Sequence, residues 1–261
     1  MRRRLAIAHV CLAAVMAVAG VRVLAFAQEP SENEAAPPLH VLFIGNSLTY
    51  TNDLPAMFTE LAVAAGRPRP FVRAVTAPGL SLQDQWDLGE AQKVIAVGGW
   101  DFVVLQQGPS ASPEGTLLLR TYSRRFTELI RAQGGRPVLY MVWPSTSRSQ
   151  DFDGVALSYR DAARDVGGIL SPAGETWRAA WRRDPKLKLY SPDGLHPTPA
   201  GTYAAAVTFF QVLYKQSPVG LPAALTLASG ETVAIPEAEA RVLQEAVVDT
   251  VGRTLAMPSR N

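Results

Sequence analysis

The chain has 261 residues, of which 48% are hydrophobic and 18% charged, which is enough apolar material for one domain with an ordinary core. Its formal net charge is +2, and no basic face of the kind that binds nucleic acid is evident. The single cysteine, Cys11, excludes an internal disulfide, and beyond the first 27 residues only His40 and His196 remain, too few for a zinc site without many carboxylates. We therefore expect no metal, no cofactor and no nucleic-acid partner.

The first 27 residues have the organisation of a secretory signal peptide. Three arginines precede an apolar run from Leu5 to about Val21, and Ala25-Phe26-Ala27 is a small-x-small cleavage pattern. Cleavage there would remove four arginines and no acidic residue, leaving 21 Lys and Arg against 23 Asp and Glu, a net charge of −2. We expect a secreted or periplasmic protein with no stable membrane insertion. The alternative, an uncleaved anchor helix, is disfavoured by Arg22 and by the short apolar run.

After a polar linker over residues 28–38, short apolar runs alternate with segments of helical spacing about every thirty residues. The expected strands are Leu39–Ile44, Phe71–Thr76, Phe102–Leu105, Val138–Trp143 and Gly168–Leu170. The expected helices are Leu54–Ala65, Leu82–Val97, Glu114–Ala132, Asp153–Val166 and Thr198–Tyr214. This alternation predicts an α/β domain over residues 39–216, with a doubly wound parallel sheet and helices on both faces.

Residues 217–261 have a different character. Three prolines punctuate a loop, and a small hairpin is expected around Ser229-Gly230. Glu237 to Leu255 then has helical spacing, with an apolar face that includes Leu243 and Val247. We expect this last helix to pack on the domain rather than to bind a partner.

Polar residues follow the expected strands at their carboxyl ends, where open α/β sheets bind their ligands. Gly45-Asn46-Ser47 follows the first strand, Ala77-Pro78-Gly79 the second and Gln106-Gln107-Gly108 the third. A serine hydroxyl becomes a nucleophile only when a base, usually histidine, takes its proton. Ser47 is therefore a candidate nucleophile if a histidine reaches the same edge of the sheet.

His196 is the histidine best placed to be that base. It follows Asp193 by three residues across a glycine, so one tight turn can bring carboxylate and imidazole together. His40 stands at the start of the first strand, the wrong end of the sheet. Each motif alone is weak, since D-x-x-H also occurs at helix N-termini and Gly, Asn and Ser are common in turns. The combination predicts a triad of Ser47, His196 and Asp193.

The same segments resemble the SGNH/GDSL hydrolase superfamily. Val41 to Thr49 is similar to its first sequence block, Gly79 matches the glycine of its second, and Asp193 to Pro197, followed by Gly201 and Tyr203, resembles its last. The resemblance covers about Leu39 to Tyr214. It implies a three-layer α/β/α sandwich of flavodoxin-like order and ester hydrolysis without a cofactor. It also implies that Ser47, His196 and Asp193 are the catalytic serine, histidine and aspartate.

Two departures concern the first and third blocks. Asn46 stands where aspartate is usual, and the third-block asparagine is missing, with Gln106 and Gln107 nearby. This resembles a bacterial branch with a GNS first block and a glutamine-bearing third block. The implied oxyanion hole consists of the backbone N–H groups of Ser47 and Gly79 with a glutamine amide, Gln106 before Gln107. The implied substrates are small-molecule or carbohydrate esters, carbohydrate acetyl esters among them.

A second hypothesis keeps the fold but not the catalysis: a catalytically weak exported module that binds glycans in the same pocket. Five aromatic residues stand near strand ends or in the later helices, namely Tyr50, Trp86, Trp143, Trp177 and Trp181. We expect most of them to pack in the core, although Trp143 and Trp86 offer an alternative role as a flat wall for a sugar ring.

Overall fold

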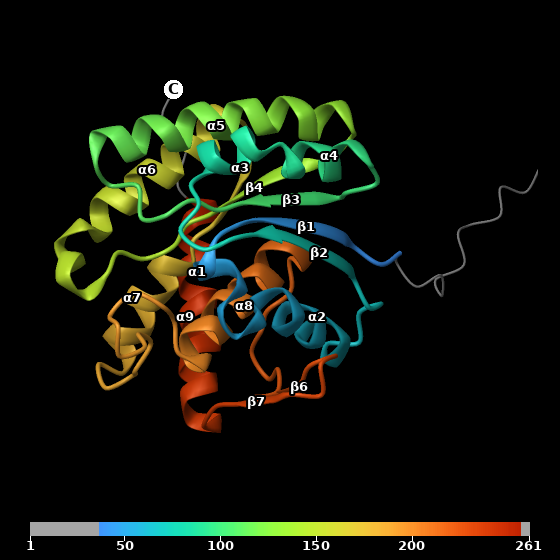
Figure 1. The fold of residues 1–261 in the computed structure, drawn as a ribbon. Helices are drawn as coiled ribbons and strands as arrows, with labels where there is room; N and C mark the ends of the chain where they lie inside the picture. Colours follow the sequence, from blue (N-terminus) through green and yellow to red (C-terminus); the bar gives the residue numbers. More distant parts are fainter. Residues whose placement is uncertain (1–36, 257–261) are drawn as a thin grey trace, which may run out of the picture. The chain divides into compact units, whose positions relative to one another are not determined.

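A computed structural model describes residues 37–256, so the expected signal segment and most of the expected linker lie outside the described residues. A five-stranded parallel sheet has the order β2-β1-β3-β4-β5 (Figure 1). Its strands are β1 (His40–Gly45), β2 (Phe71–Thr76), β3 (Phe102–Leu105), β4 (Arg136–Tyr140) and β5 (Ile169–Ser171). This is the doubly wound flavodoxin-like order, and it confirms the expected fold class.

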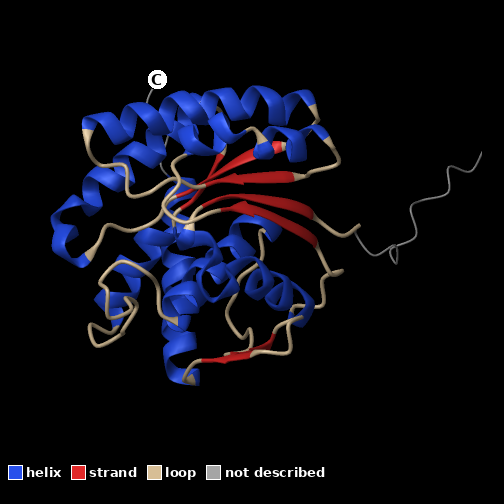
Figure 2. Ribbon diagram, in the orientation of Figure 1, coloured by secondary structure: helices blue, strands red, loops and turns tan. Residues whose placement is uncertain are grey.

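Helices cover both faces of the sheet and complete three layers (Figures 1 and 2). On one face lie α3 (Leu82–Leu88), α4 (Glu90–Ala96), α5 (Pro113–Ala132) and α6 (Phe152–Asp165). On the other lie α2 (Leu54–Ala64), α7 (Ala173–Arg183), α8 (Pro199–Tyr214) and α9 (Glu237–Ala256). The last of these, α9, packs along α7 and α8. Within residues 37–256, no helix combines the length and the hydropathy needed to cross a bilayer.

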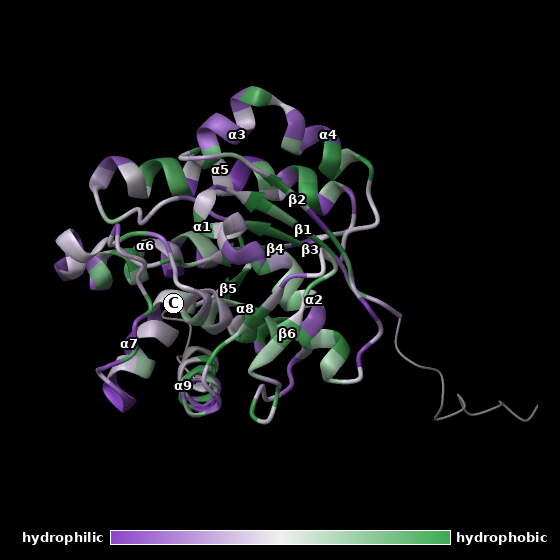
Figure 3. Cartoon of the chain, turned by 60° about the horizontal axis from the view of Figure 1, so that its bottom comes forward, coloured by the Kyte–Doolittle hydropathy of each residue, from purple (hydrophilic) through white to green (hydrophobic). Residues whose placement is uncertain are grey.

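The central strands are apolar because both of their faces are covered. All residues of β3 are buried, as are Val41 to Gly45 in β1. On the α2 and α8 side, the Phe43 ring meets Phe58 and Phe209 edge-on, at centroid distances of 6.3 and 5.3 Å. Figure 3 shows these strands green between helices that carry purple outer turns. A parallel sheet enclosed in this way requires continuous apolar runs rather than alternating ones.

Three elements differ from the expectation. The fourth strand ends at Tyr140 rather than Trp143, because the short β5 offers a partner only as far as Ser171. The single helix expected over 82–97 is two helices, α3 and α4, separated by Gly89 in the left-handed region at φ +78°. Helix α7 was not expected. The hairpin near Ser229 is present as β6 (Ala224–Thr226) and β7 (Thr232–Ala234).

The strand register determines which residues share the functional edge. Gly45 pairs with Thr76, and Ile44 pairs with Leu105, so the loops after β1, β2 and β3 leave the sheet side by side. Ser47 lies at this edge, directly after β1. His40 begins β1 at the opposite end of the sheet, where its ring lies against Phe71.

Candidate active site

Ser47 is the first residue of α1 (Ser47–Tyr50), a single helical turn directly after β1. Asn46 caps this turn, and its Oδ1 accepts a hydrogen bond from the Leu48 amide at 3.0 Å. Gly45 is required at the bend, because a side chain there would overlap Gln106 Oε1 and Thr49 Oγ1. Gly45 and Asn46 therefore have separate structural roles: Gly45 leaves space for Gln106 and Thr49, and Asn46 caps the helical turn.

Gln106 lies beneath this turn and has no exposed surface. Its Oε1 accepts hydrogen bonds from the Asn46 amide and from Thr49 Oγ1, both at 2.8 Å. Its Nε2 donates to the Gln107 carbonyl at 2.8 Å. These contacts contradict the expected oxyanion-donor role, because a fully buried amide engaged with the protein does not reach a substrate oxygen. Gln106 instead holds the backbone of the nucleophile turn.

Gln107 is also engaged within the protein. Its Nε2 donates to Ser110 Oγ at 2.8 Å and to the Gly115 carbonyl at 3.1 Å, and its Oε1 accepts from the Leu82 amide at 3.3 Å. Both amide hydrogens are therefore used. Gln107 thus has no amide hydrogen left for a substrate, and the Gln106 amide is fully buried.

The Asn46 side chain joins the nucleophile turn to the loop that carries Gly79. Its Nδ2 donates to the Leu80 carbonyl at 3.0 Å, which an aspartate at this position could not do. Gly79 adopts φ +69°. Within residues 37–256, the backbone N–H groups of Ser47 and Gly79 have no hydrogen-bond partner. A hollow of about 280 Å³ reaches Gly79 and is lined mostly by small and polar residues: Asn46, Gly79, Leu80, Ser81, Gln107, Gly108, Pro109, Ser110, Ser112 and Gly115.

His196 is carried by a tight turn that starts at Ser191. The Ser191 amide donates to the His196 carbonyl at 2.8 Å, and the turn bends at Gly194, where φ is +71°. Thr146, which follows β4 in the chain, donates its backbone N–H to the Gly194 carbonyl at 2.8 Å. Any side chain at Gly194 would overlap Thr146 Oγ1, so a glycine is required for both reasons.

Trp143 supports the same turn from the core. Its Nε1 donates to the Leu195 carbonyl at 3.0 Å, and its ring stacks on Trp177 at 3.5 Å between centroids. Both rings have no exposed surface, and Trp86 packs edge-on against Phe126 at 5.2 Å. Core packing is therefore the correct interpretation for Trp143, which cannot be a wall for a sugar ring, whereas the Trp86 ring is half-buried, with Arg125 at 5.6 Å from its centroid.

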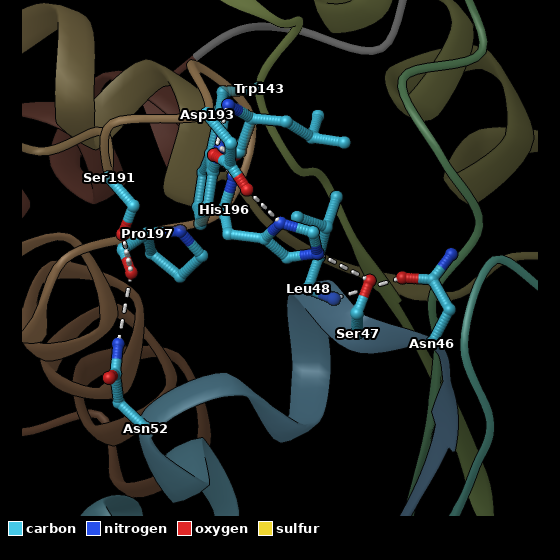
Figure 4. Close-up of polar contacts among 10 residues, drawn as sticks. Asn46, Ser47, Leu48, Asn52, Trp143, Ser191, Asp193, His196 and Pro197 are labelled. Carbon is cyan, nitrogen blue, oxygen red and sulfur yellow. Dashed lines mark hydrogen bonds and ion pairs between the residues drawn. The ribbon is translucent and has the colours of Figure 1, made fainter.

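The structure brings Ser47, His196 and Asp193 into one hydrogen-bonded line (Figure 4). His196 Nε2 lies 2.9 Å from Ser47 Oγ, and His196 Nδ1 lies 2.5 Å from Asp193 Oδ2. Asp193 Oδ1 accepts from the amides of Leu195 and His196, each at 2.9 Å. The carboxylate therefore holds the imidazole with Nδ1 protonated and Nε2 free to accept the serine proton.

The same contacts keep Asp193 ionised. Hydrogen bonds from the Leu195 amide, from the His196 ring and from the His196 amide lower the pKa of the Asp193 carboxyl to about 2. A lowered folded-state pKa stabilises the fold above the unfolded value of about 3.9, and this contribution is lost as pH falls through the folded value. We expect carbon NMR of the Asp193 carboxyl to give a midpoint near 2. A midpoint near 4 would contradict the geometry of the turn.

Three supports of the site could not be predicted from the sequence. Gln85 Nε2 donates to the Gly45 carbonyl at 2.7 Å, Thr146 holds the histidine turn, and Asn52 contacts the carbonyl of Pro197 at 3.0 Å. All three lie outside the short motifs, and only the folded chain brings them to the site. Among the described residues, no group of three or more His, Cys, Asp or Glu side chains could hold a metal ion.

Comparison with known proteins relates this geometry to solved structures. No family model matches the chain, and no curated protein matches it. A candidate SGNH hydrolase from Slackia heliotrinireducens is 27% identical, with a TM-score of 0.59 over 68% of this chain and 100% of its own. A DUF4886 family protein from Bacteroides uniformis is 18% identical, with a TM-score of 0.65 over 86% of this chain and 98% of its own.

A variant of an acetyl-xylooligosaccharide esterase from Geobacillus is also similar. It is 16% identical, with a TM-score of 0.50 over 67% of this chain and 94% of its own. At these identities the likeness concerns the fold. The five-stranded parallel sheet with its flanking helices is an SGNH-hydrolase-like fold, structurally similar to SGNH and GDSL-like hydrolases.

Proposed function

We propose that this chain is an exported serine esterase that hydrolyses carboxylic esters through Ser47, His196 and Asp193. One observation carries the proposal: His196 Nε2 lies 2.9 Å from Ser47 Oγ, and the other ring nitrogen lies on the Asp193 carboxylate. A nucleophile, a base and an orienting carboxylate in hydrogen-bond contact are the arrangement that activates a serine. Export rests on the organisation of residues 1–27.

The reaction is acyl transfer to water in two steps. Ser47 Oγ attacks the ester carbonyl while His196 Nε2 takes its proton, and His196 then returns the proton to the leaving alcohol. Water, deprotonated by the same nitrogen, attacks the acyl-serine, and His196 returns that proton to Ser47 Oγ as the acid leaves. The oxyanion of each tetrahedral intermediate binds to the free backbone N–H groups of Ser47 and Gly79. Neither glutamine takes part in this step, and both support the loops that carry these groups.

The hollow beside Asn46 and Gly79 favours short acyl groups. Its lining is small and polar, with Leu80 and Pro109 as the only larger apolar residues. An acetyl group on a sugar hydroxyl fits such a lining, and the similar Geobacillus structure is named for an acetylated xylooligosaccharide. We therefore propose carbohydrate acetyl esters as a substrate class.

A series of p-nitrophenyl esters from acetate to octanoate tests this substrate class. An apolar acyl channel would gain about 0.8 kcal/mol per buried methylene, which raises kcat/KM about fourfold per step. We expect no such rise, because the hollow offers no apolar channel. A steady fourfold gain per methylene would contradict the short-acyl proposal while leaving the esterase intact.

Fluorophosphonate labelling separates the esterase from a glycan-binding module on the same fold. An activated Ser47 should react covalently, and peptide mass spectrometry should locate the adduct on Ser47. Ser47→Ala is the matched control and should not label. A wild-type protein that is folded but unlabelled, or labelled elsewhere, would refute the proposed function.

A further inference from the structure

The segment after the nucleophile turn contains two consecutive non-glycine residues in the left-handed region. Asn52 has φ 54° and ψ 24°, and Asp53 has φ 49° and ψ 58°. Among residues 37–256 only one other non-glycine residue, Lys215, has a positive φ. Asparagine tolerates this conformation better than most residues, but holding it still requires support from the surroundings. The support at Asn52 comes from the histidine side of the site.

The Asn52 side chain crosses from the nucleophile segment to the histidine segment. Its Nδ2 donates to the Pro197 carbonyl at 3.0 Å (Figure 4). The same nitrogen donates to Thr202 Oγ1 at 2.9 Å, so both amide hydrogens are used. Pro197 directly follows His196, and its carbonyl also accepts from Ser191 Oγ at 3.0 Å. The Pro197–Thr198 peptide, one residue beyond the base, is therefore held by Asn52 and by Ser191.

The separation of Ser47 and His196 depends on how two distant segments meet. The two residues are 149 positions apart in the chain, and their own hydrogen bond is a single contact. Asn52 adds a second connection, five residues after the nucleophile and one residue after the base. Because Asn52 is only half-buried and its amide bonds to a carbonyl and a hydroxyl, it contributes little to the apolar core.

We propose that Asn52 is a positioning residue, which sets the approach of His196 to Ser47 without touching the substrate. The proposal rests on the proposed esterase function. The left-handed backbone turns the chain so that the amide faces the Pro197 carbonyl, and the amide then fixes the histidine turn against the nucleophile turn. Misplacement of a catalytic group by about 1 Å costs up to about a hundredfold in rate, so loss of this connection lowers turnover.

The test compares two variants that keep the backbone but remove the amide donors. Asn52→Gly tolerates the left-handed region freely, and Asn52→Asp tolerates it as asparagine does, but neither donates to Pro197 at neutral pH. Both should lower kcat by about tenfold to a hundredfold, with KM within about twofold, and should slow fluorophosphonate labelling of Ser47 by the same factor. Lys215→Gly makes the matching backbone change at the end of α8 and should leave kcat unchanged.

Each outcome decides the proposal. If Asn52→Gly and Asn52→Asp keep wild-type kcat while Asn52→Ala is impaired, Asn52 matters only because it tolerates the left-handed backbone conformation, and the proposal is wrong. A raised KM at unchanged kcat would place Asn52 in substrate binding and also overturn it, as would a loss of activity that follows only the unfolded fraction. If the wild-type protein does not label at Ser47, the esterase function itself is overturned. If wild type and Asn52→Gly label equally fast, only the positioning role of Asn52 is overturned.

Discussion

Replacing Ser47 with alanine is expected to lower kcat by about 10⁴- to 10⁶-fold, and replacing His196 with alanine should cost about as much. The reason is the 2.9 Å contact between them, through which the base creates the nucleophile. Without either partner the other has no function in the first step. The double variant should therefore be little worse than either single variant, because the two residues act as one unit.

The measurement is the initial rate of acetate-ester hydrolysis by each variant at saturating substrate. Circular dichroism controls for folding, since both side chains lie at the surface edge of the site and their removal leaves the core intact. Asp193→Ala should cost less than either, because it removes the orientation of His196 but not the base itself. Losses that simply multiply in the double variant would show that the two groups do not cooperate.

The elements that could be predicted are those in which local pattern and tertiary environment agree. The buried strands β1 and β3 have continuous apolar sequences because helices cover both of their faces. The end of β4 could not be predicted in this way, since Met141 to Trp143 are equally apolar and buried but lie beyond the last pairing with β5. Helix α7 was missed although Trp177 and Trp181 have helical spacing, because its Ala and Arg residues give little apolar signal.

In the candidate site, too, some features follow from the sequence pattern and others depend on tertiary contacts. Parallel topology places the ends of neighbouring strands at one edge, so the closeness of Ser47 and the histidine turn follows from strand order. The alternation of side chains along β3 could not reveal the role of Gln106. Its Oε1 accepts the buried backbone N–H of Asn46, a contact that only the folded chain shows. Nor could the sequence pattern reveal Asn52, whose role depends on backbone angles that only the folded chain shows.

Replacing Gln106 with leucine is expected to lower the free energy of unfolding by about 2–4 kcal/mol, because two buried polar groups are left without a partner at about 1–3 kcal/mol each, with partial relief from apolar burial. These groups are the Asn46 N–H and the Thr49 hydroxyl, whereas the Gln107 carbonyl loses the Gln106 donor but keeps the Tyr159 hydroxyl. In a domain of this size the loss corresponds to a fall in Tm of about 10 °C. Activity should fall as well, because the Asn46 peptide that precedes Ser47 is no longer held.

Thr49→Val is the matched control for this prediction. It removes one hydroxyl hydrogen bond to the same Oε1 in an equally buried position, and should cost only about 1–2 kcal/mol. Urea unfolding of the two variants and of wild type provides the comparison. An oxyanion donor at Gln106 would instead show a hundredfold or greater fall in kcat with unchanged stability. A Gln106→Leu protein as stable as wild type but deficient in turnover would therefore restore the donor role that the buried hydrogen bonds now exclude.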